Sequence, residues 1–479
     1  MRDSLTNDRS GHFAALDEAR PSRFQYKIMF VSGMGFFTDA YDLFIIGVVV
    51  SLLRSQWDLT TTQVSLLNSA TLVASALGAI VFGRIADMLG RKRIYGYEVL
   101  ILAAGAIASA LAPNFAFLLI ARAILGIGVG GDYPVSATIM SEYSGRASRG
   151  RMVGLVFAMQ GAGLVFGPLL ASGLLASGLS HDTIWRLLLG FGAIPGLAVF
   201  YLRRQIKETP RFALAGGVAE EAEAAIAMAT GGAIPVGGGE SSARIRGGAF
   251  SGARTLFSSP RMVKWLIGTA LSWMLLDFAY YGNSISSPTV LNLLDPHASL
   301  LRNTLLQLGV FAVFALPGYL LAIWLMDRMG RRPIQLLGFA LMAVSFLLIA
   351  AVPSVVHVAG TFVFLYGMSY LFSEFGPNTT TFVYPAEIFP VEVRTTGHGI
   401  SAAAGKIGAF IGAYLFPQML ASSMGIRGAE LVAGLVSLVG FAVTAICLPE
   451  PKGRSLEELT ELGLGHGPER KPELVSASA

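Results

Sequence analysis

The sequence predicts an all-α membrane protein, in which twelve transmembrane helices form two pseudo-symmetric bundles of six. Hydrophobic residues make up 53% of the chain and charged residues only 14%, whereas about 25% of the residues of a soluble globular domain are charged. Apolar stretches long enough to cross about 30 Å of hydrocarbon recur along nearly all of the 479 residues. A weak internal repeat relates the two parts of the chain. These observations favour a membrane protein over a soluble protein with one large core.

The apolar stretches define twelve predicted helices. They cover residues 24–53, 62–86, 94–112, 115–141, 152–177, 184–203, 262–288, 300–326, 334–352, 357–385, 396–421 and 428–448. An even number of crossings places both termini on the same side of the membrane.

Lys and Arg gather in alternate loops between these helices. The basic loops hold Arg84, Arg91, Lys92, Arg93, Arg146, Arg149, Arg151, Arg203, Arg204, Lys207, Arg211, Arg328, Arg331, Arg332 and Arg394. The positive-inside rule assigns such loops to the cytoplasm. We therefore expect a multi-pass protein of the cell membrane with both termini cytoplasmic, and we interpret the net charge of +5 as topology, not as nucleic-acid binding.

The same pattern divides the chain into five regions. We expect a cytoplasmic N-terminal segment (1–23), a six-helix bundle (24–204), a cytoplasmic linker (205–260), a second six-helix bundle (261–449) and a mobile cytoplasmic tail (450–479). The first segment lacks the apolar core and cleavage site of a signal peptide, so the first helix is expected to direct insertion. A short surface helix is expected in the linker, around 218–229.

Two basic loops repeat the pattern Asp-x-x-Gly-Arg. One runs from Asp87 to Arg91, and the other runs from Asp327 to Arg331, 240 residues later. The glycine permits a tight turn, and each arginine can pair with an acid of a neighbouring helix. Plain positive-inside topology is the alternative interpretation. The recurrence in register with the repeat favours a charged latch that gates the cytoplasmic side.

The first predicted helix carries Asp39 and Asp42, which lie on roughly one helical face. Carboxylates held close together repel, so that one keeps its proton. This pair is a candidate for proton coupling, and helix polarity near the membrane surface is the alternative. Arg122 is expected to meet Asp39 or Asp42.

The fourth predicted helix carries Arg122, Asp132 and Tyr133 among several glycines and Pro134, in the middle of a long apolar segment. Charges at membrane depth are costly and usually functional. Arg122 and Asp132 are ten residues apart, or about 15 Å along a helix, so they cannot pair with each other. The segment is therefore expected to form one wall of a buried polar site.

Other predicted helices carry polar side chains that are candidates for the same buried site. Trp273, Asp277 and Tyr281 follow each other at intervals of four, on one face of the seventh helix. Gln160 of the fifth helix is either a site residue or a helix–helix fastener. When the two repeats are aligned, Asn378 corresponds to Tyr133. Lys406 is a lone cation in the eleventh helix.

Catalytic chemistry is not indicated. The sequence contains no Gly-rich loop ending in Lys-Ser or Lys-Thr, and its six histidines lack metal-ligand spacing. We therefore expect neither an enzyme nor a metal or cofactor site, and the single cysteine excludes an internal disulfide. Internal repeats with a polar site between them are typical of secondary transporters.

The loop motifs resemble those of the major facilitator superfamily. The Asp-x-x-Gly-Arg loops do so together with Lys207-Glu-Thr-Pro-Arg-Phe212 and Pro449-Glu-Pro-Lys-Gly-Arg454, which resemble motifs of its sugar-porter members. The resemblance spans the membrane portion and implies an alternating-access fold.

Three further stretches resemble the phosphate:proton symporter family. They are Gly35-Phe-Phe-Thr-Asp-Ala-Tyr-Asp-Leu-Phe44, Gly130-Gly-Asp-Tyr-Pro-Val-Ser-Ala-Thr-Ile-Met-Ser-Glu142 and Phe375-Gly-Pro-Asn-Thr-Thr-Thr-Phe-Val-Tyr-Pro-Ala-Glu-Ile-Phe-Pro390. The resemblance implies that phosphate is bound by Tyr133, Gln160, Trp273, Asp277, Tyr281 and Asn378. It also implies that Asp39, Asp132 and Glu98 handle protons and that Lys406 is a charge partner. The departures, at Val135, Thr379 and Tyr384, remove none of these residues.

The charge count and the resemblance point to different substrates. Four intramembrane aspartates against Arg122 and Lys406 suggest a cation or drug, and an anion fits only if some of these carboxyls are protonated. The expected function is proton-coupled phosphate import. The alternatives are transport of another solute, such as a sugar, an organic cation or a carboxylate, and phosphate sensing without transport.

Overall fold

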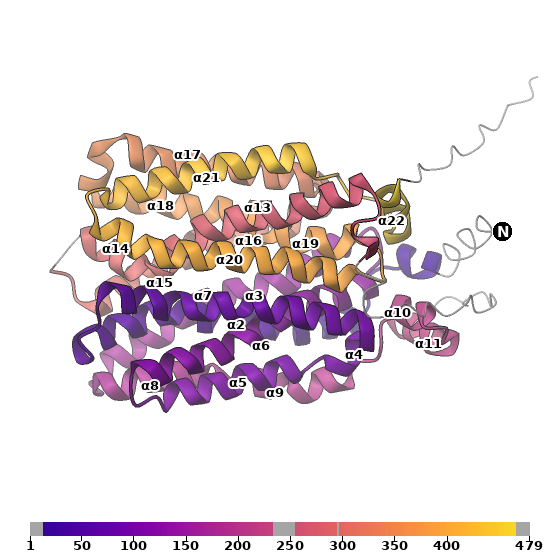
Figure 1. Cartoon of the computed structure of the whole chain (residues 1–479), viewed down its shortest axis with the longest axis horizontal. Coiled ribbons are helices and arrows are strands. Elements are labelled where there is room, and N and C mark those ends of the chain that lie inside the picture. The colour runs from indigo at the N-terminus through magenta and orange to yellow at the C-terminus, as the bar shows by residue number, and fades with distance from the viewer. Residues whose placement is uncertain (1–12, 233–253, 295–296, 466–479) are drawn as a thin grey trace, which may run out of the picture.

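Two bundles of long helices lie side by side with their axes roughly parallel in the computed structural model (Figure 1). The structure describes residues 13–232, 254–294 and 297–465, and the regular structure in these ranges is helical. Helices from residues 23–205 form the lower bundle of Figure 1, and helices from residues 260–447 form the upper one. The loops with Arg91, Arg149, Arg331 and Arg394 share one end of both bundles, which we call the basic end.

The first bundle makes six crossings. Its helices are α2 (Arg23–Gln56), α3 (Thr61–Leu89), α4 (Arg91–Ile94) with α5 (Tyr97–Ala110), α6 (Phe115–Tyr143), α7 (Arg149–Ala176), and α8 (His181–Phe191) with α9 (Ala193–Gln205). Two of the crossings consist of two helices each. The first of these breaks at Gly96, whose φ of 110° favours glycine, and the second breaks at Gly192.

The second bundle also makes six crossings. Its helices are α13 (Pro260–Ile285), α15 (Leu300–Val310) with η1 (Phe311–Ala315) and α16 (Leu316–Met329), α17 (Arg331–Ala351), α18 (Ala359–Ser373) with η3 (Glu374–Asn378) and α19 (Thr379–Ile388), α20 (Arg394–Ala421) and α21 (Gly425–Cys447). The short helices α14 (Ser287–Leu294) and η2 (Pro353–His357) connect crossings.

The predicted twelve-helix fold is confirmed. Eleven helices within the described ranges are long and apolar enough to cross a membrane. The twelfth crossing runs from α18 through η3 to α19, and its helix is interrupted at Gly376 (φ −103°, ψ −108°). Pro377 follows directly and lacks a backbone N–H, which accounts for a break at this point.

Two expectations about the basic end are wrong. Arg203 was assigned to a basic loop, but the last turn of α9 buries it completely inside the first bundle. The polar tail was expected to be mobile, yet α22 (Leu456–Leu464) is a packed helix beside α13 and α19. Leu456 and Leu459 are buried, and Ser259 Oγ donates a hydrogen bond to the carbonyl of Gly463 over 2.6 Å. Residues 466–479 lie outside the described part.

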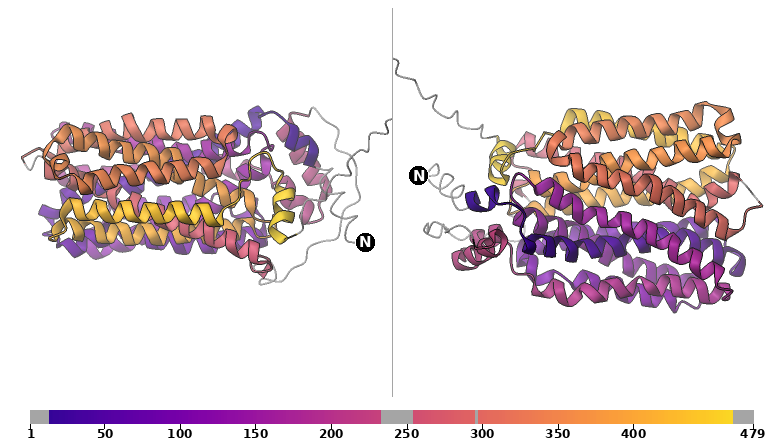
Figure 2. Two further views of the ribbon diagram at one scale, coloured as in Figure 1. Left: turned by 90° about the horizontal axis from the view of Figure 1, so that it is seen from above. Right: turned by 180° about the vertical axis from the view of Figure 1, so that it is seen from behind.

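The linker contributes two helices at the basic end, α10 (Pro210–Ala215) and α11 (Ala219–Thr230), which pack against each other beside the first bundle (Figure 2). The second of them lies where the sequence predicts a surface helix. Residues 233–253 of the linker lie outside the described part.

The two Asp-x-x-Gly-Arg loops have the same local structure. Gly90 and Gly330 take φ values of 100° and 98°, which an L-amino acid rarely adopts. Glu208 accepts hydrogen bonds from the backbone N–H groups of Arg91 and Lys92, each over 3.2 Å. In the second bundle Glu450 accepts those of the two residues after Gly330, over 3.1 and 2.9 Å. Each glutamate satisfies N–H groups at a helix start that have no partner within the helix.

Small residues bring the membrane helices into close contact. A Cβ added to Gly130 of α6 would lie 1.9 Å from the carbonyl oxygen of Ser75 on α3, so only glycine fits this crossing. By contrast, nothing lies within 4 Å of a Cβ added to Gly173 of α7.

We expect Gly130→Ala to destabilise the first bundle. Overpacking a tight interior typically costs about 1–3 kcal/mol. Thermal unfolding of the detergent-purified protein, followed by tryptophan fluorescence, should show a lower midpoint for this variant. Gly173→Ala is the matched control and should unfold at or above the wild-type temperature. Equal midpoints for Gly130→Ala and wild type would contradict the close α3–α6 contact.

Candidate functional site

A chain of neutral polar side chains joins the two bundles. Gln160 Nε2 of α7 donates to the hydroxyl of Tyr133 on α6 over 2.8 Å. On the other side of the seam, Tyr319 of α16 donates to Gln160 Oε1 over 3.3 Å, and Asn378 Nδ2 donates to Tyr319 over 3.0 Å. The structure therefore places Tyr133 and Asn378, the pair related by the repeat, at opposite ends of one hydrogen-bonded chain.

Tyr319 is a member of this chain that the sequence analysis missed. Its hydroxyl is one of few polar groups in an apolar crossing, and it is fully buried. That isolated polar residue was the available signal. Glu374 adds a further buried group, because Asn378 Nδ2 also donates to Glu374 Oε2 over 2.5 Å.

A buried ammonium group lies against the same chain. Lys406 Nζ of α20 donates to Asp277 Oδ2 over 3.1 Å and to the hydroxyl of Tyr281 over 3.0 Å, both on α13. The ammonium also lies over the rings of Tyr133 and Tyr281, 4.5 and 4.4 Å from their centroids. Its contact with Tyr133 links a cation of the second bundle to a residue of the first.

Aromatic rings surround this cluster. The ring of Trp273 lies 6.0 Å from that of Tyr133, measured between centroids. Phe36, Phe157 and Phe382 pack against Tyr133 from α2, α7 and α19. Rings without hydrogen-bonding groups exclude water from the polar side chains, which strengthens the electrostatic interactions among them. The six predicted substrate residues and Lys406 thus form one enclosed cluster at the interface of the bundles, and we call it the central cluster.

A second charged group lies inside the first bundle. Arg203 of α9 donates to both carboxylate oxygens of Asp132, each over 2.8 Å, and to Glu98 Oε1 over 2.7 Å. The ring of Tyr95 lies 4.7 Å from the guanidinium carbon. All of these side chains are buried. Asp132 and Glu98 therefore share one guanidinium, and Asp132 is the residue that directly precedes Tyr133 of the central cluster.

The two aspartates of α2 are also buried, but the structure does not join them. No hydrogen bond links the carboxyl groups of Asp39 and Asp42, and none of their four oxygens has a partner among the described residues. Arg122 does meet α2 at Asp42, although it donates to the backbone carbonyl, over 2.6 Å. Carboxyls without partners in a membrane interior are stable chiefly in their protonated form.

At the basic end, the first Asp-x-x-Gly-Arg loop contacts the second bundle. Asp87 accepts hydrogen bonds from the backbone N–H and the hydroxyl of Thr396, both over 2.6 Å. Arg91 pairs with Asp87 over 3.1 Å and reaches Glu142 over 3.3 Å. Arg394 of the second bundle donates to the same glutamate over 2.9 Å. These contacts hold the two bundles together at this end.

The second loop makes the corresponding contacts. Arg331 pairs with Asp327 over 3.1 Å and donates to Glu387 over 2.6 and 2.9 Å. Asp327 accepts the backbone N–H of Arg151, from the first bundle, over 3.0 Å. The four residues expected to act as a latch thus lie at the seam between the bundles.

Segments outside the membrane reinforce this seam. Arg211, at the start of α10, donates to Glu457 of α22 over 2.9 Å. Burial opposes ionisation of Glu457, but the interaction with Arg211 outweighs it and holds the pKa of this carboxyl below its ordinary value. Asp17, in a helical turn before α2, accepts hydrogen bonds from Arg149 and Arg211, each over 3.1 Å. Burial raises the pKa of Glu208, which caps the first loop.

Residues 23–462 match the family model described as sugar (and other) transporter. The chain is 36% identical to the probable inorganic phosphate transporter 1-12 of Oryza sativa subsp. japonica, with 93% of each chain covered. It is 34% identical to the probable inorganic phosphate transporter 1-6 of Arabidopsis thaliana, over 95% of this chain and 97% of that one.

The chain belongs to the major facilitator superfamily. Within it, the predicted kinship with the phosphate:proton symporter family is confirmed. The fold of this major facilitator transporter also resembles that of the proton:xylose symporter XylE bound to 6-bromo-6-deoxy-D-glucose. The TM-score is 0.74 at 20% identity, and 92% of this chain and 99% of that chain are covered.

We expect Glu142→Gln to loosen the basic end of this transporter, because Arg91 and Arg394 both lose their shared carboxylate. A hydrogen bond to a charged group is worth about 1.5–3 kcal/mol, so the ratio of open to closed forms should rise about tenfold or more. Spin labels at positions 93 and 264, one on each bundle, report this separation by pulsed electron paramagnetic resonance. Glu221→Gln, on the exposed face of α11, is the control. Identical distance distributions for Glu142→Gln and wild type would exclude a latch at Glu142.

Proposed function

We propose that this transporter imports inorganic phosphate together with protons by alternating access. The observation that carries the proposal is the contact of Lys406 with Asp277, Tyr281 and Tyr133 between the bundles. It supplies one buried cation among neutral hydrogen-bond donors, which suits an anion of single charge. The names of the relatives in rice and Arabidopsis support phosphate as that anion.

Dihydrogen phosphate fits the donors and acceptors of the central cluster. Its unprotonated oxygens accept hydrogen bonds from Lys406 and from the neutral groups of Tyr133, Gln160, Trp273, Tyr281 and Asn378. Its two P–OH groups need acceptors, and the carboxylate of Asp277 supplies one. Phosphate then takes the place of Asp277 as the partner of Lys406, so Asp277 either accepts a P–OH hydrogen bond or takes up a proton.

Proton coupling follows from the cost of unbalanced charge in the membrane. The first bundle buries Asp39, Asp42, Glu98 and Asp132 against Arg122 and Arg203. A second anion at the site is tolerated when one of these carboxyls or Asp277 is protonated. When Asp132 or Glu98 takes up a proton, it loosens its hold on Arg203, and α6 carries that change to the adjacent Tyr133. Loss of the proton on the other side of the membrane expels phosphate.

The remaining assignments concern topology and movement. The bundles 24–204 and 261–449 rock about the central cluster, and the linker 205–260 connects them. Asp87, Arg91, Asp327 and Arg331 latch the basic end when it is closed. The basic end faces the cytoplasm of a cell-membrane protein, because basic loops are retained on that side. Both termini and the linker are then cytoplasmic.

The alternative to phosphate as the transported substrate is a sugar, an organic cation or a carboxylate. The family description and the proton:xylose symporter keep sugars among the candidates. A neutral sugar gains nothing from the charge of Lys406, whereas an oxyanion pairs with it. Competition between sugars and phosphate for uptake therefore distinguishes the two substrates. A phosphate sensor without transport would bind phosphate with no net flux.

Purified protein in proteoliposomes should take up radiolabelled phosphate when the outside is more acidic than the inside. Asp277→Asn should abolish this uptake, because Lys406 then has no carboxylate to balance it before phosphate arrives. Asp182→Asn, at the exposed start of α8, should leave uptake unchanged. Full pH-driven uptake by Asp277→Asn would refute its assigned role. Xylose or a dicarboxylate that competes better than phosphate would refute the substrate.

Tyr133→Phe and Asn378→Ala should each weaken phosphate binding more than folding. A lost hydrogen bond to a charged ligand is worth about 1.5–3 kcal/mol, or roughly a 10- to 150-fold rise in Kd. Isothermal titration with phosphate gives the Kd, and thermal unfolding gives the stability of the same samples. Unchanged affinity in both variants would remove Tyr133 and Asn378 from the site.

A further inference from the structure

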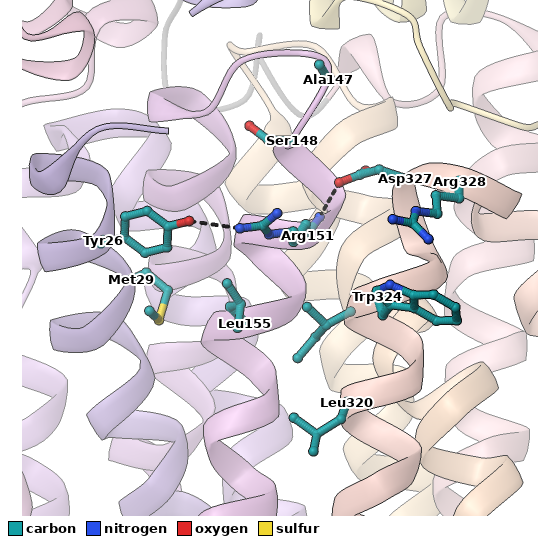
Figure 3. Close-up of a pocket in the computed structure, with 11 residues that line it drawn as sticks. Tyr26, Met29, Ala147, Ser148, Arg151, Leu155, Leu320, Trp324, Asp327 and Arg328 are labelled. Atoms are coloured by element: carbon teal, nitrogen blue, oxygen red, sulfur yellow. Dashed lines mark hydrogen bonds between the residues drawn. The ribbon is translucent and has the colours of Figure 1, made fainter. Parts of the chain in front are cut away.

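A pocket separate from the central cluster opens at the seam between the bundles, near the basic end (Figure 3). It has a volume of about 530 Å³, and α2, α7 and α16 supply most of its lining. Tyr26 and Arg151 come from the first bundle, and Trp324 and Arg328 come from the second. None of these residues belongs to the proposed phosphate site.

Two arginines of the lining, both labelled in Figure 3, give the pocket positive charge. The guanidinium of Arg151 donates to the hydroxyl of Tyr26 over 2.8 Å, and that of Arg328 lies over the ring of Trp324, 4.8 Å from its centroid. Within residues 13–232, 254–294 and 297–465, neither guanidinium forms an ion pair. Asp327 is the one carboxylate of the lining, and Arg331 and the N–H of Arg151 already hold it. The pocket therefore presents two guanidiniums that remain available to an anion.

Apart from Ser148, the rest of the lining is apolar. Met29, Leu155 and Leu320 lie on the side of the pocket away from the loops in Figure 3, and Ile323 also belongs to the lining. Along η1 and α16 the apolar lining continues into a stripe of exposed side chains, Val313, Leu320 and Trp324, which are 62%, 58% and 58% exposed. Their spacing of seven and four residues puts them on one helical face, and one further turn leads to Arg328. In a membrane protein such a face contacts acyl chains, and the arginine at its end lies at the depth of the head groups.

We propose that this pocket binds an anionic phospholipid from the membrane leaflet at the basic end. Arg151 and Arg328 hold the phosphodiester, and the stripe of α16 accommodates an acyl chain. A zwitterionic amine lipid is disfavoured because the single acid of the lining is already paired. A soluble phosphate ion makes no use of the apolar wall. Because α7 and α16 belong to different bundles, the bound lipid bridges them, whatever solute the transporter carries.

The full-length protein in detergent tests the proposal by titration with fluorescent phosphatidylglycerol. Arg151→Gln/Arg328→Gln should bind this lipid about 30-fold more weakly than wild type, since a cation near an anionic lipid is worth about 1 kcal/mol. The matched control is Arg93→Gln/Lys264→Gln, which removes two exposed cations of the basic end outside the pocket and should bind like wild type. If both double variants bound phosphatidylglycerol equally weakly, the general positive charge of the surface would explain binding, and the proposed pocket would be wrong.

Competition and quenching experiments distinguish an anionic phospholipid from a zwitterionic lipid and from free phosphate. Unlabelled phosphatidylglycerol should displace the probe, whereas phosphatidylethanolamine and millimolar inorganic phosphate should not. Displacement by either of the last two would overturn the choice of lipid. If the Arg151→Gln/Arg328→Gln variant does not fold, quenching of Trp324 in the otherwise unchanged protein still tests the proposal. Phosphatidylglycerol brominated on its acyl chain should quench Trp324 more than brominated phosphatidylcholine does, with Trp324→Phe as the background. Equal quenching by the two lipids would refute the proposal.

Discussion

Burial of charge in a membrane interior is the constraint on which the rest of the structure depends. An unpaired charge at this depth costs at least a few kcal/mol, so the chain has to bring partners to each buried cation. Arg203 forms a bidentate ion pair with Asp132 and donates a further hydrogen bond to Glu98. Lys406 pairs with Asp277 and contacts two tyrosine rings. Because the partners come from different helices, these pairs also set how the helices pack.

The two charge clusters differ in what can disturb them. Arg203 and its two acids lie within the first bundle, so a proton can enter or leave without separating the bundles. Lys406 lies at the interface, where it contacts Tyr133 of the other bundle. An anion bound beside Lys406 would therefore interact with both bundles. The adjacency of Asp132 and Tyr133 on α6 connects the clusters. The proposed coupling of protons to phosphate rests on this one helix.

The internal repeat explains why the basic end closes in two places. Glycines with nearly equal φ values shape both loops, and Glu208 and Glu450 cap both following helices. The repeats are not used identically, however. Glu142 of the first bundle accepts Arg394 from the second, whereas Glu387 pairs with Arg331 of its own bundle. The pocket lined by Arg151 and Arg328 lies at the seam beside the second loop, and it is there that we propose a lipid binds.

The sequence by itself determined the crossings, because the length of an apolar run and the position of basic loops are local properties. It also supplied the residue types of the central cluster, since Trp273, Asp277 and Tyr281 share a helical face by their spacing alone. Tertiary structure alone decided which charges meet. Arg203 looked like one more loop arginine until the last turn of α9 buried it beside Asp132. Tyr319 and the packed helix α22 were missed for a related reason, because contacts between segments far apart along the chain leave no periodic signal in the sequence.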